Sequence, residues 1–164
     1  MASSKLYEVF EKATKMQAEG RKVAKLYVGE PSDATPKAIV KAGIEALKQG
    51  FTKYGAAGGE IALSKKIGEL HGVSHENIVV TPGSKIALYS LLKNCLKAGD
   101  EILLPSPHWP AFELMTKDLQ LNLKLITMTL EQGYQLIPDE LEKAISKDTK
   151  ALVLVNPSNP TSVA

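Results

Sequence analysis

Apolar side chains recur every three to four residues along six segments of this chain, a spacing that predicts amphipathic helices. The predicted helices cover residues 5–19, 36–49, 60–71, 86–97, 109–117 and a stretch that begins at Pro138. Runs of neighbouring apolar residues, bounded by turn-forming or charged residues, predict strands between these helices. They are residues 25–28, as a short strand or extended piece, and 78–80, 101–105, 121–127 and 151–155.

Two of the helices carry boundary signals and apolar faces. Thr35 followed by Pro36 predicts an N-cap and a first helical residue, and Gly50 predicts the end of that helix. Its inward side chains are expected to be Ile39, Val40, Ile44 and Leu47. The helix at 86–97 is expected to bury Leu88, Leu91, Leu92, Leu96 and the single cysteine, Cys95.

Strands and helices alternate from residue 78 onward, and such alternation is typical of a parallel sheet with helices on both faces. The runs 78–80 and 151–155 are expected to be buried strands. We therefore predict an α/β protein, a three-layer αβα arrangement with a mostly parallel sheet, preceded by an N-terminal helical segment.

The composition narrows the function classes. With 44% apolar and 23% charged residues the chain is typical of globular proteins, and no apolar run reaches the roughly 18 to 20 residues of a transmembrane helix. The formal charge is +2 with scattered basic residues, which argues against nucleic acid as a partner. One cysteine forms no internal disulfide, and no Cys/His cluster has metal-ligand spacing. With the polar N-terminus, these features favour the cytoplasm and no membrane partner.

Gly83, Ser84 and Lys85 lie between a predicted strand and a predicted helix. The first turn of such a helix presents unpaired N–H groups and the positive end of the helix dipole, which together bind anions. Turns of this kind also occur in many α/β proteins that bind nothing there. Position alone therefore leaves both interpretations open.

Trp109 is the only tryptophan and follows the strand predicted at 101–105. A large flat ring at this place can stack on a heteroaromatic ligand, but a packing role is at least as common. His108, its neighbour in a proline-rich turn, can act as a base, although a surface or hydrogen-bonded role is more typical. These residues taken singly do not identify a function.

The segment Asn156-Pro157-Ser158-Asn159-Pro160-Thr161 follows the apolar run 151–155. Ligands of open α/β sheets bind beyond the carboxyl ends of the strands, so Asn159 stands where a ligand is expected. The segment resembles the Asn-Pro-x-Asn-Pro-Thr-Gly signature of the class I and II aminotransferases, which use pyridoxal phosphate (PLP) on the type I fold. Ser162 replaces the final glycine, a residue that tolerates backbone angles that serine resists.

The resemblance to this family extends from Leu26 to Thr161 and implies roles for single residues. It implies that three groups contact the cofactor of the same subunit: Gly83, Ser84 and Lys85 at the phosphate, Trp109 stacked on the pyridine ring, and Asn159 at the phenolic oxygen. Tyr54, in a glycine-rich loop, is implied to reach the phosphate of the partner's cofactor. The residues implied to lie near the substrate are Gly29, Trp109 and Asn159.

The resemblance also implies parts that this chain lacks. In the family, the lysine that binds PLP covalently, the aspartate at the pyridine nitrogen and the substrate-binding arginine all follow the Asn-Pro-Thr segment, so no catalytic residue is assigned here. We therefore expect an N-terminal portion of a longer enzyme. Residues 1–50 would belong to the small domain or dimer arm, and 51–164 to the PLP-binding domain. Strand 78–80 is expected to stand apart from the other three, because later strands separate them in the family's sheet.

The implied activity is transamination, the exchange of an amino group between an amino acid and a 2-oxo acid, by a homodimer. Two alternatives stay open. One is a non-catalytic fragment that binds phosphate, PLP or a partner; the other is a different PLP reaction, such as that of a carbon–sulfur lyase, because fold and cofactor do not fix the reaction.

Overall fold

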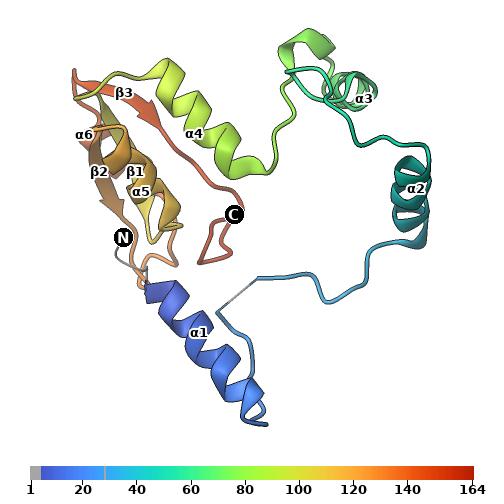
Figure 1. The fold of residues 1–164 in the computed structure, drawn as a ribbon. Helices are drawn as coiled ribbons and strands as arrows, with labels where there is room; N and C mark the ends of the chain where they lie inside the picture. The colour runs from blue at the N-terminus through green and yellow to red at the C-terminus, as the bar shows by residue number, and fades with distance from the viewer. Residues whose placement is uncertain (1–4, 28) are drawn as a thin grey trace. The chain divides into compact units, whose positions relative to one another are not determined.

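The structure is a computed structural model that describes residues 5–27 and 29–164 (Figure 1). The chain forms two compact units, residues 1–54 and 55–164. The first unit holds helices α1 (Lys5–Ala18) and α2 (Lys37–Lys48). The helices of the second unit are α3 (Ile61–His71), the 3₁₀ helix η1 (His75–Asn77), α4 (Ser84–Cys95), α5 (Ala111–Asp118) and α6 (Pro138–Ala144).

The first unit contains no strand among its described residues. The segment predicted as a short strand or extended piece at 25–28 is a turn at Leu26 and Tyr27, while Val28 lies outside the described residues. At the start of this turn, Leu26 donates its N–H to the Ala24 carbonyl. The Tyr27 ring meets the Phe10 ring edge to face, with centroids 5.8 Å apart.

Two predictions about α2 are wrong. Thr35 is not the N-cap, because Pro36 itself takes the cap position with an extended ψ of 136°, and no side chain caps the helix. The apolar side chains expected to point inward are exposed: Ile39, Val40, Ile44 and Leu47. A unit whose described residues form two helices and no sheet offers α2 little apolar surface on which to bury them.

The second unit is built on a parallel sheet of three strands. They are β1 (Glu101–Ser106), β2 (Asn122–Thr127) and β3 (Thr149–Leu152), in the spatial order β2-β1-β3. The central strand β1 pairs along its whole length with β2. Its apolar residues Ile102, Leu103 and Leu104 are the largest fully buried side chains of the described structure.

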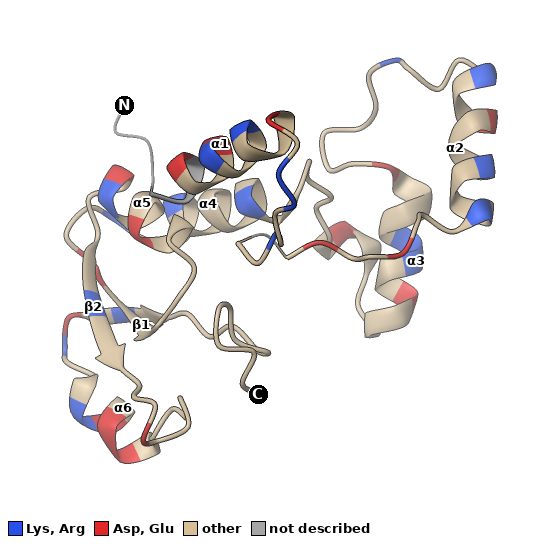
Figure 2. Cartoon of the chain, turned by 90° about the horizontal axis from the view of Figure 1, so that it is seen from below, with Lys and Arg blue, Asp and Glu red and all other residues tan. Residues whose placement is uncertain are grey.

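Helices cover both faces of this sheet, with α4 and α5 on one side of the strands and α6 on the other (Figure 2). Ile102 packs in a cluster with Leu92 of α4 and Met115 of α5. On the other face, Lys124 donates to the Ala144 carbonyl at the end of α6. The predicted α/β fold with three layers and a parallel sheet is confirmed.

Residues 78–80 do not form the predicted buried strand. Val80 donates to the Gly58 carbonyl, but no strand among the described residues pairs with the segment, and the Val79 side chain is exposed. A strand needs a neighbour to accept its ladder hydrogen bonds. The segment lies outside the sheet formed by the other three strands, as expected.

The final strand is shorter and more exposed than predicted. It covers 149–152 rather than 151–155, and Leu154 and Val155 are exposed. One further ladder bond follows it, from the Val153 N–H to the Leu103 carbonyl. Within the described structure β3 pairs only with β1, so a run that would be buried between two neighbours lies at an edge.

The apolar face of α4 is only partly covered. Leu92 is buried, and Leu88 and Leu96 pack against the same cluster, as expected. Leu91 and Cys95 are exposed, contrary to the prediction. The period of a helix places all five side chains on one broad stripe, but α5 and the sheet contact only part of its width.

A carboxylate joins β1 to β3 at the start of the sheet. Glu101 accepts hydrogen bonds from the hydroxyls of Thr149 and Ser146, and these bonds hold the pKa of Glu101 below its usual value. A lowered folded-state pKa contributes stability above the unfolded-state pKa, and that contribution is lost as the pH falls through the folded-state pKa.

Thr149→Val is therefore expected to lower the free energy of unfolding at neutral pH and to weaken its dependence on pH in the acid range. Urea unfolding between about pH 7 and about pH 3 measures both effects. Thr127→Val is the control, because it makes the same change at an exposed position at the end of β2, away from Glu101, and should leave the acid dependence unchanged. Equal acid profiles of the two variants would contradict the role given to Glu101.

Candidate functional site

The N-terminus of α4 is open. Gly83 precedes the helix with a φ of +90°, a left-handed value that favours glycine, and no side chain caps the first turn. Ser84 and Lys85 are exposed, and a Cβ added at Gly83 would meet no atom within 4 Å. The first amides of α4 are thus accessible to a ligand, with the positive end of the helix dipole behind them.

Lys85 and Trp109 lie together. The Lys85 ammonium is 5.3 Å from the centroid of the Trp109 ring, a cation–π distance. Trp109 also meets the Phe112 ring edge to face, with centroids 5.7 Å apart. Trp109, the predicted stacking residue, therefore lies next to Lys85 of the predicted anion-binding turn, although the two residues are 24 positions apart in the sequence.

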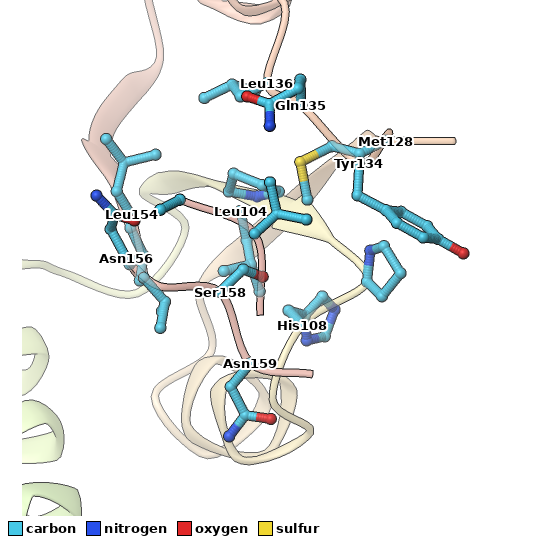
Figure 3. A pocket seen from close by; sticks show the side chains of 16 residues that line it. Leu104, His108, Met128, Tyr134, Gln135, Leu136, Leu154, Asn156, Ser158 and Asn159 are labelled. Carbon is cyan, nitrogen blue, oxygen red and sulfur yellow. The ribbon is translucent and has the colours of Figure 1, made fainter. Parts of the chain in front are cut away.

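Asn159 belongs to a tight loop after β3. The Ser158 N–H donates to the Val163 carbonyl and the Ser162 N–H donates to the Ser158 carbonyl, each at 2.7 Å. This loop forms one wall of a pocket of about 230 Å³ at the carboxyl ends of β1 and β3, with His108 in another wall (Figure 3). Asn159 and His108 line this pocket, whereas Lys85 and Trp109 do not.

Ser162 adopts a left-handed backbone with a φ of +60°, an angle that serine resists. A side chain at such an angle costs roughly 1 kcal/mol, which glycine avoids. Ser162→Gly is expected to raise the free energy of unfolding by about 1 kcal/mol in urea titrations. Ser158→Gly is the matched control, because Ser158 has no left-handed angle and its replacement is expected to lower stability.

The two predicted residues of the first unit are accessible. The Tyr54 side chain is fully exposed, and a Cβ added at Gly29 would meet nothing within 4 Å. Both lie in the unit of residues 1–54, whereas the remaining candidates lie in the unit of residues 55–164. Their predicted roles at a partner's cofactor and near a substrate stay predictions.

His108 is more deeply placed than a turn histidine suggests. Its side chain is 8% exposed, and its ring nitrogens lie near the Trp109 carbonyl and the Glu113 carboxylate. The sequence offers Glu113, in the first turn of the next helix, as a neighbour for His108, but no sequence pattern indicates that the imidazole is nearly buried. The described residues contain no cluster of three or more potential metal ligands. None of the described helices is long and apolar enough to cross a membrane.

Comparison with known proteins decides the family. Residues 21–164 match the family model described as aminotransferase class I and II. The chain belongs to the class I and II aminotransferases. The aspartate aminotransferase of Geobacillus stearothermophilus is 36% identical over 94% of this chain, and the (5-formylfuran-3-yl)methyl phosphate transaminase of Methanocaldococcus jannaschii is 34% identical over 96% of it.

Solved structures of this aminotransferase family share the fold. The aspartate aminotransferase from Thermus thermophilus, solved with maleate, matches 98% of the chain with a TM-score of 0.91 and 32% sequence identity. The chain spans 41% of the length of the Geobacillus protein and 44% of the Thermus chain. These aminotransferases carry different substrate names, so family membership does not select a substrate.

Proposed function

We propose that this chain forms part of a PLP-dependent aminotransferase, in which it holds the cofactor's phosphate and one face of its ring. The observation that carries the proposal is the open N-terminus of α4 beside Trp109, in a chain that matches the aminotransferase family over residues 21–164. The reaction would transfer an amino group from an amino acid to a 2-oxo acid.

The residues present fit an anionic group attached to an aromatic ring. Uncapped amides at Ser84 and the ammonium of Lys85 supply donors and positive charge for a phosphate. Trp109 supplies an aromatic face within reach of the same ammonium. Lys85 is exposed, so its ammonium can move from the indole toward a phosphate at the helix N-terminus.

In the proposed site, Gly83 lets the backbone approach the phosphate, and Ser84 and Lys85 bind its oxygens. Trp109 stacks on the pyridine ring, and Asn159 donates its amide N–H to the ring's phenolic oxygen. Bound PLP would supply an electron-withdrawing ring that stabilises negative charge at the substrate's Cα. Gly29 would lie near the substrate carboxylate.

We also propose a homodimer in which Tyr54 reaches the phosphate of the partner's cofactor. The full exposure of the phenol supports an intermolecular role, because a tyrosine ring left in water gains no burial energy. Analytical ultracentrifugation over a series of protein concentrations tests for the dimer, because it measures the mass of the species in solution.

A fluorescence titration tests cofactor binding directly, because Trp109 is the only tryptophan. PLP is expected to quench its emission in a saturable manner, and inorganic phosphate is expected to relieve the quenching. Pyridoxal, which lacks the phosphate, should bind more weakly. Quenching no greater than that of free tryptophan would contradict the proposed site in this chain.

A further inference from the structure

Lys85 and Trp109, the residues proposed to hold the phosphate and the ring of PLP, belong to different helical segments. Lys85 is in the first turn of α4, and Trp109 lies two residues before α5 begins. The distance between them therefore depends on how α4 is fixed to α5. Their cation–π contact is one link, but it is lost when the ammonium turns toward a phosphate, so it cannot fix the helices while PLP is bound.

A hydrogen bond between two side chains provides a second link. The Tyr89 hydroxyl of α4 donates to Oδ2 of Asp118, the last residue of α5, at 2.5 Å. This bond raises the pKa of Tyr89 above its usual value, so the phenol keeps its proton, and with it the bond, at neutral pH. No other side-chain hydrogen bond or ion pair joins the described residues of α4 and α5.

Each helix connects its end of this link to the candidate site. On α4, Tyr89 lies four residues after Lys85, so the two side chains share one face of the helix. On the other side, Phe112 of α5 donates its N–H to the Trp109 carbonyl at 3.2 Å, and the two rings meet edge to face. Trp109 is thereby fixed to α5. Lys85, Tyr89 and Asp118 line one groove between the helices.

We propose that Tyr89 and Asp118 are positioning residues that fix α4 to α5 and so set the spacing between the N-terminus of α4 and the Trp109 ring. The role in cofactor binding rests on the proposed function, because it presumes that these two places bind the phosphate and the ring of PLP. A ligand held at two places gains affinity when their spacing is fixed, because its second contact costs little further entropy. Neither contact alone depends on the spacing.

The experiment compares Tyr89→Phe with Tyr134→Phe in the whole 164-residue chain. Both variants lose one hydroxyl and keep the ring, and Tyr134 lies in the loop after β2 rather than on α4 or α5. In the fluorescence titration, Tyr89→Phe should bind PLP about threefold more weakly than the wild-type chain. Pyridoxal, which makes only the ring contact, should bind equally well to both. Tyr134→Phe should match the wild-type chain for both ligands.

Asp118→Ala tests whether the two residues act through their shared bond. This substitution removes the acceptor, but it also removes a negative charge, which can strengthen phosphate binding by itself. The comparison is therefore made within the Asp118→Ala background, where the addition of Tyr89→Phe should cause no further change in PLP affinity. A further threefold loss in that background would overturn the role given to the bond.

Energy transfer measures the link without PLP. Cys95, the only cysteine, is exposed at the end of α4, and Trp109 is the only tryptophan. With an AEDANS acceptor attached to Cys95, the decay of the Trp109 emission gives the distribution of distances between the end of α4 and the indole. We expect a wider distribution in Tyr89→Phe than in the wild-type chain and in Tyr134→Phe.

The outcomes separate the two proposals. Equal distance distributions in Tyr89→Phe and the wild-type chain overturn the positioning role. A loss of pyridoxal binding as large as the loss of PLP binding, or no loss of either, overturns its part in cofactor binding. If PLP does not bind the wild-type chain, the proposed function fails, and the energy-transfer comparison still decides whether the bond fixes α4 to α5.

Discussion

Lys85→Met is expected to weaken PLP binding by about tenfold to thirtyfold, the loss that follows when one hydrogen bond to a charged group is removed. The helix N-terminus remains in this variant, so the first amides of α4 still bind the phosphate and some affinity survives. Methionine keeps most of the apolar stem and removes only the ammonium over the Trp109 ring. The fluorescence titration measures the ratio of dissociation constants.

Lys93→Met is the matched control for this prediction. Lys93 lies on the same helix, and its ammonium is 6.0 Å from the centroid of the Tyr89 ring, so the two substitutions remove similar contacts. Lys93 is two turns away from the N-terminus of α4, and its replacement should leave PLP binding unchanged. Equal losses in both variants would mean that general charge, rather than the α4 N-terminus, attracts the ligand.

Pyridoxal separates the phosphate contact from the ring contact. It retains the ring that is proposed to stack on Trp109 but carries no phosphate, so Lys85→Met should alter its binding little. A large loss of pyridoxal binding would assign Lys85 to the ring and would remove it from the phosphate site.

The order of elements could be predicted from the sequence because it depends on local patterns. The apolar run at β1 and the helical period of α5 lie in short windows that contain their own information. Gly50 adopts the left-handed angle that its position at the end of a helix suggests. The angle at Ser162 did not follow from the sequence, because serine resists the left-handed backbone that this residue adopts.

Burial and pairing could not be predicted with equal success, because they depend on distant segments. Residues 78–80 have the composition of a strand, but no strand of the described structure pairs with them. Ile39 and Leu47 lie on the apolar side of α2, yet that side remains exposed. A periodic pattern predicts which side chains share a face of a helix. Whether that face is buried depends on the tertiary structure.

The candidate site shows the same division. The sequence placed Lys85 and Trp109 at the ends of two different strand-to-helix turns, and their proximity follows from the packing of α4 and α5 on one face of the sheet. The contact between His108 and Glu113 is local in sequence, but nothing in the spacing shows that the imidazole is nearly buried. Burial is what turns an ordinary histidine into a residue whose partners matter.

Leu103→Ala is expected to lower the free energy of unfolding by about 3 kcal/mol. Leu103 is 0% exposed at the centre of β1, with a paired strand on each side. Its removal costs the transfer energy of the lost methyl and methylene groups and leaves a cavity that the paired backbone cannot close, because collapse would break ladder hydrogen bonds on both sides. Urea unfolding followed by far-ultraviolet circular dichroism measures the loss.

Leu152→Ala tests whether this loss belongs to the centre of the sheet. Leu152 is the register partner of Leu103 on the edge strand β3 and is 38% exposed, so the same substitution removes less buried surface and leaves a site that solvent can fill. Its cost should stay below about 1.5 kcal/mol. Similar losses at the two positions would mean that β3 is as well covered as β1 in solution. In that case a further segment or a second protein molecule would cover the edge strand β3.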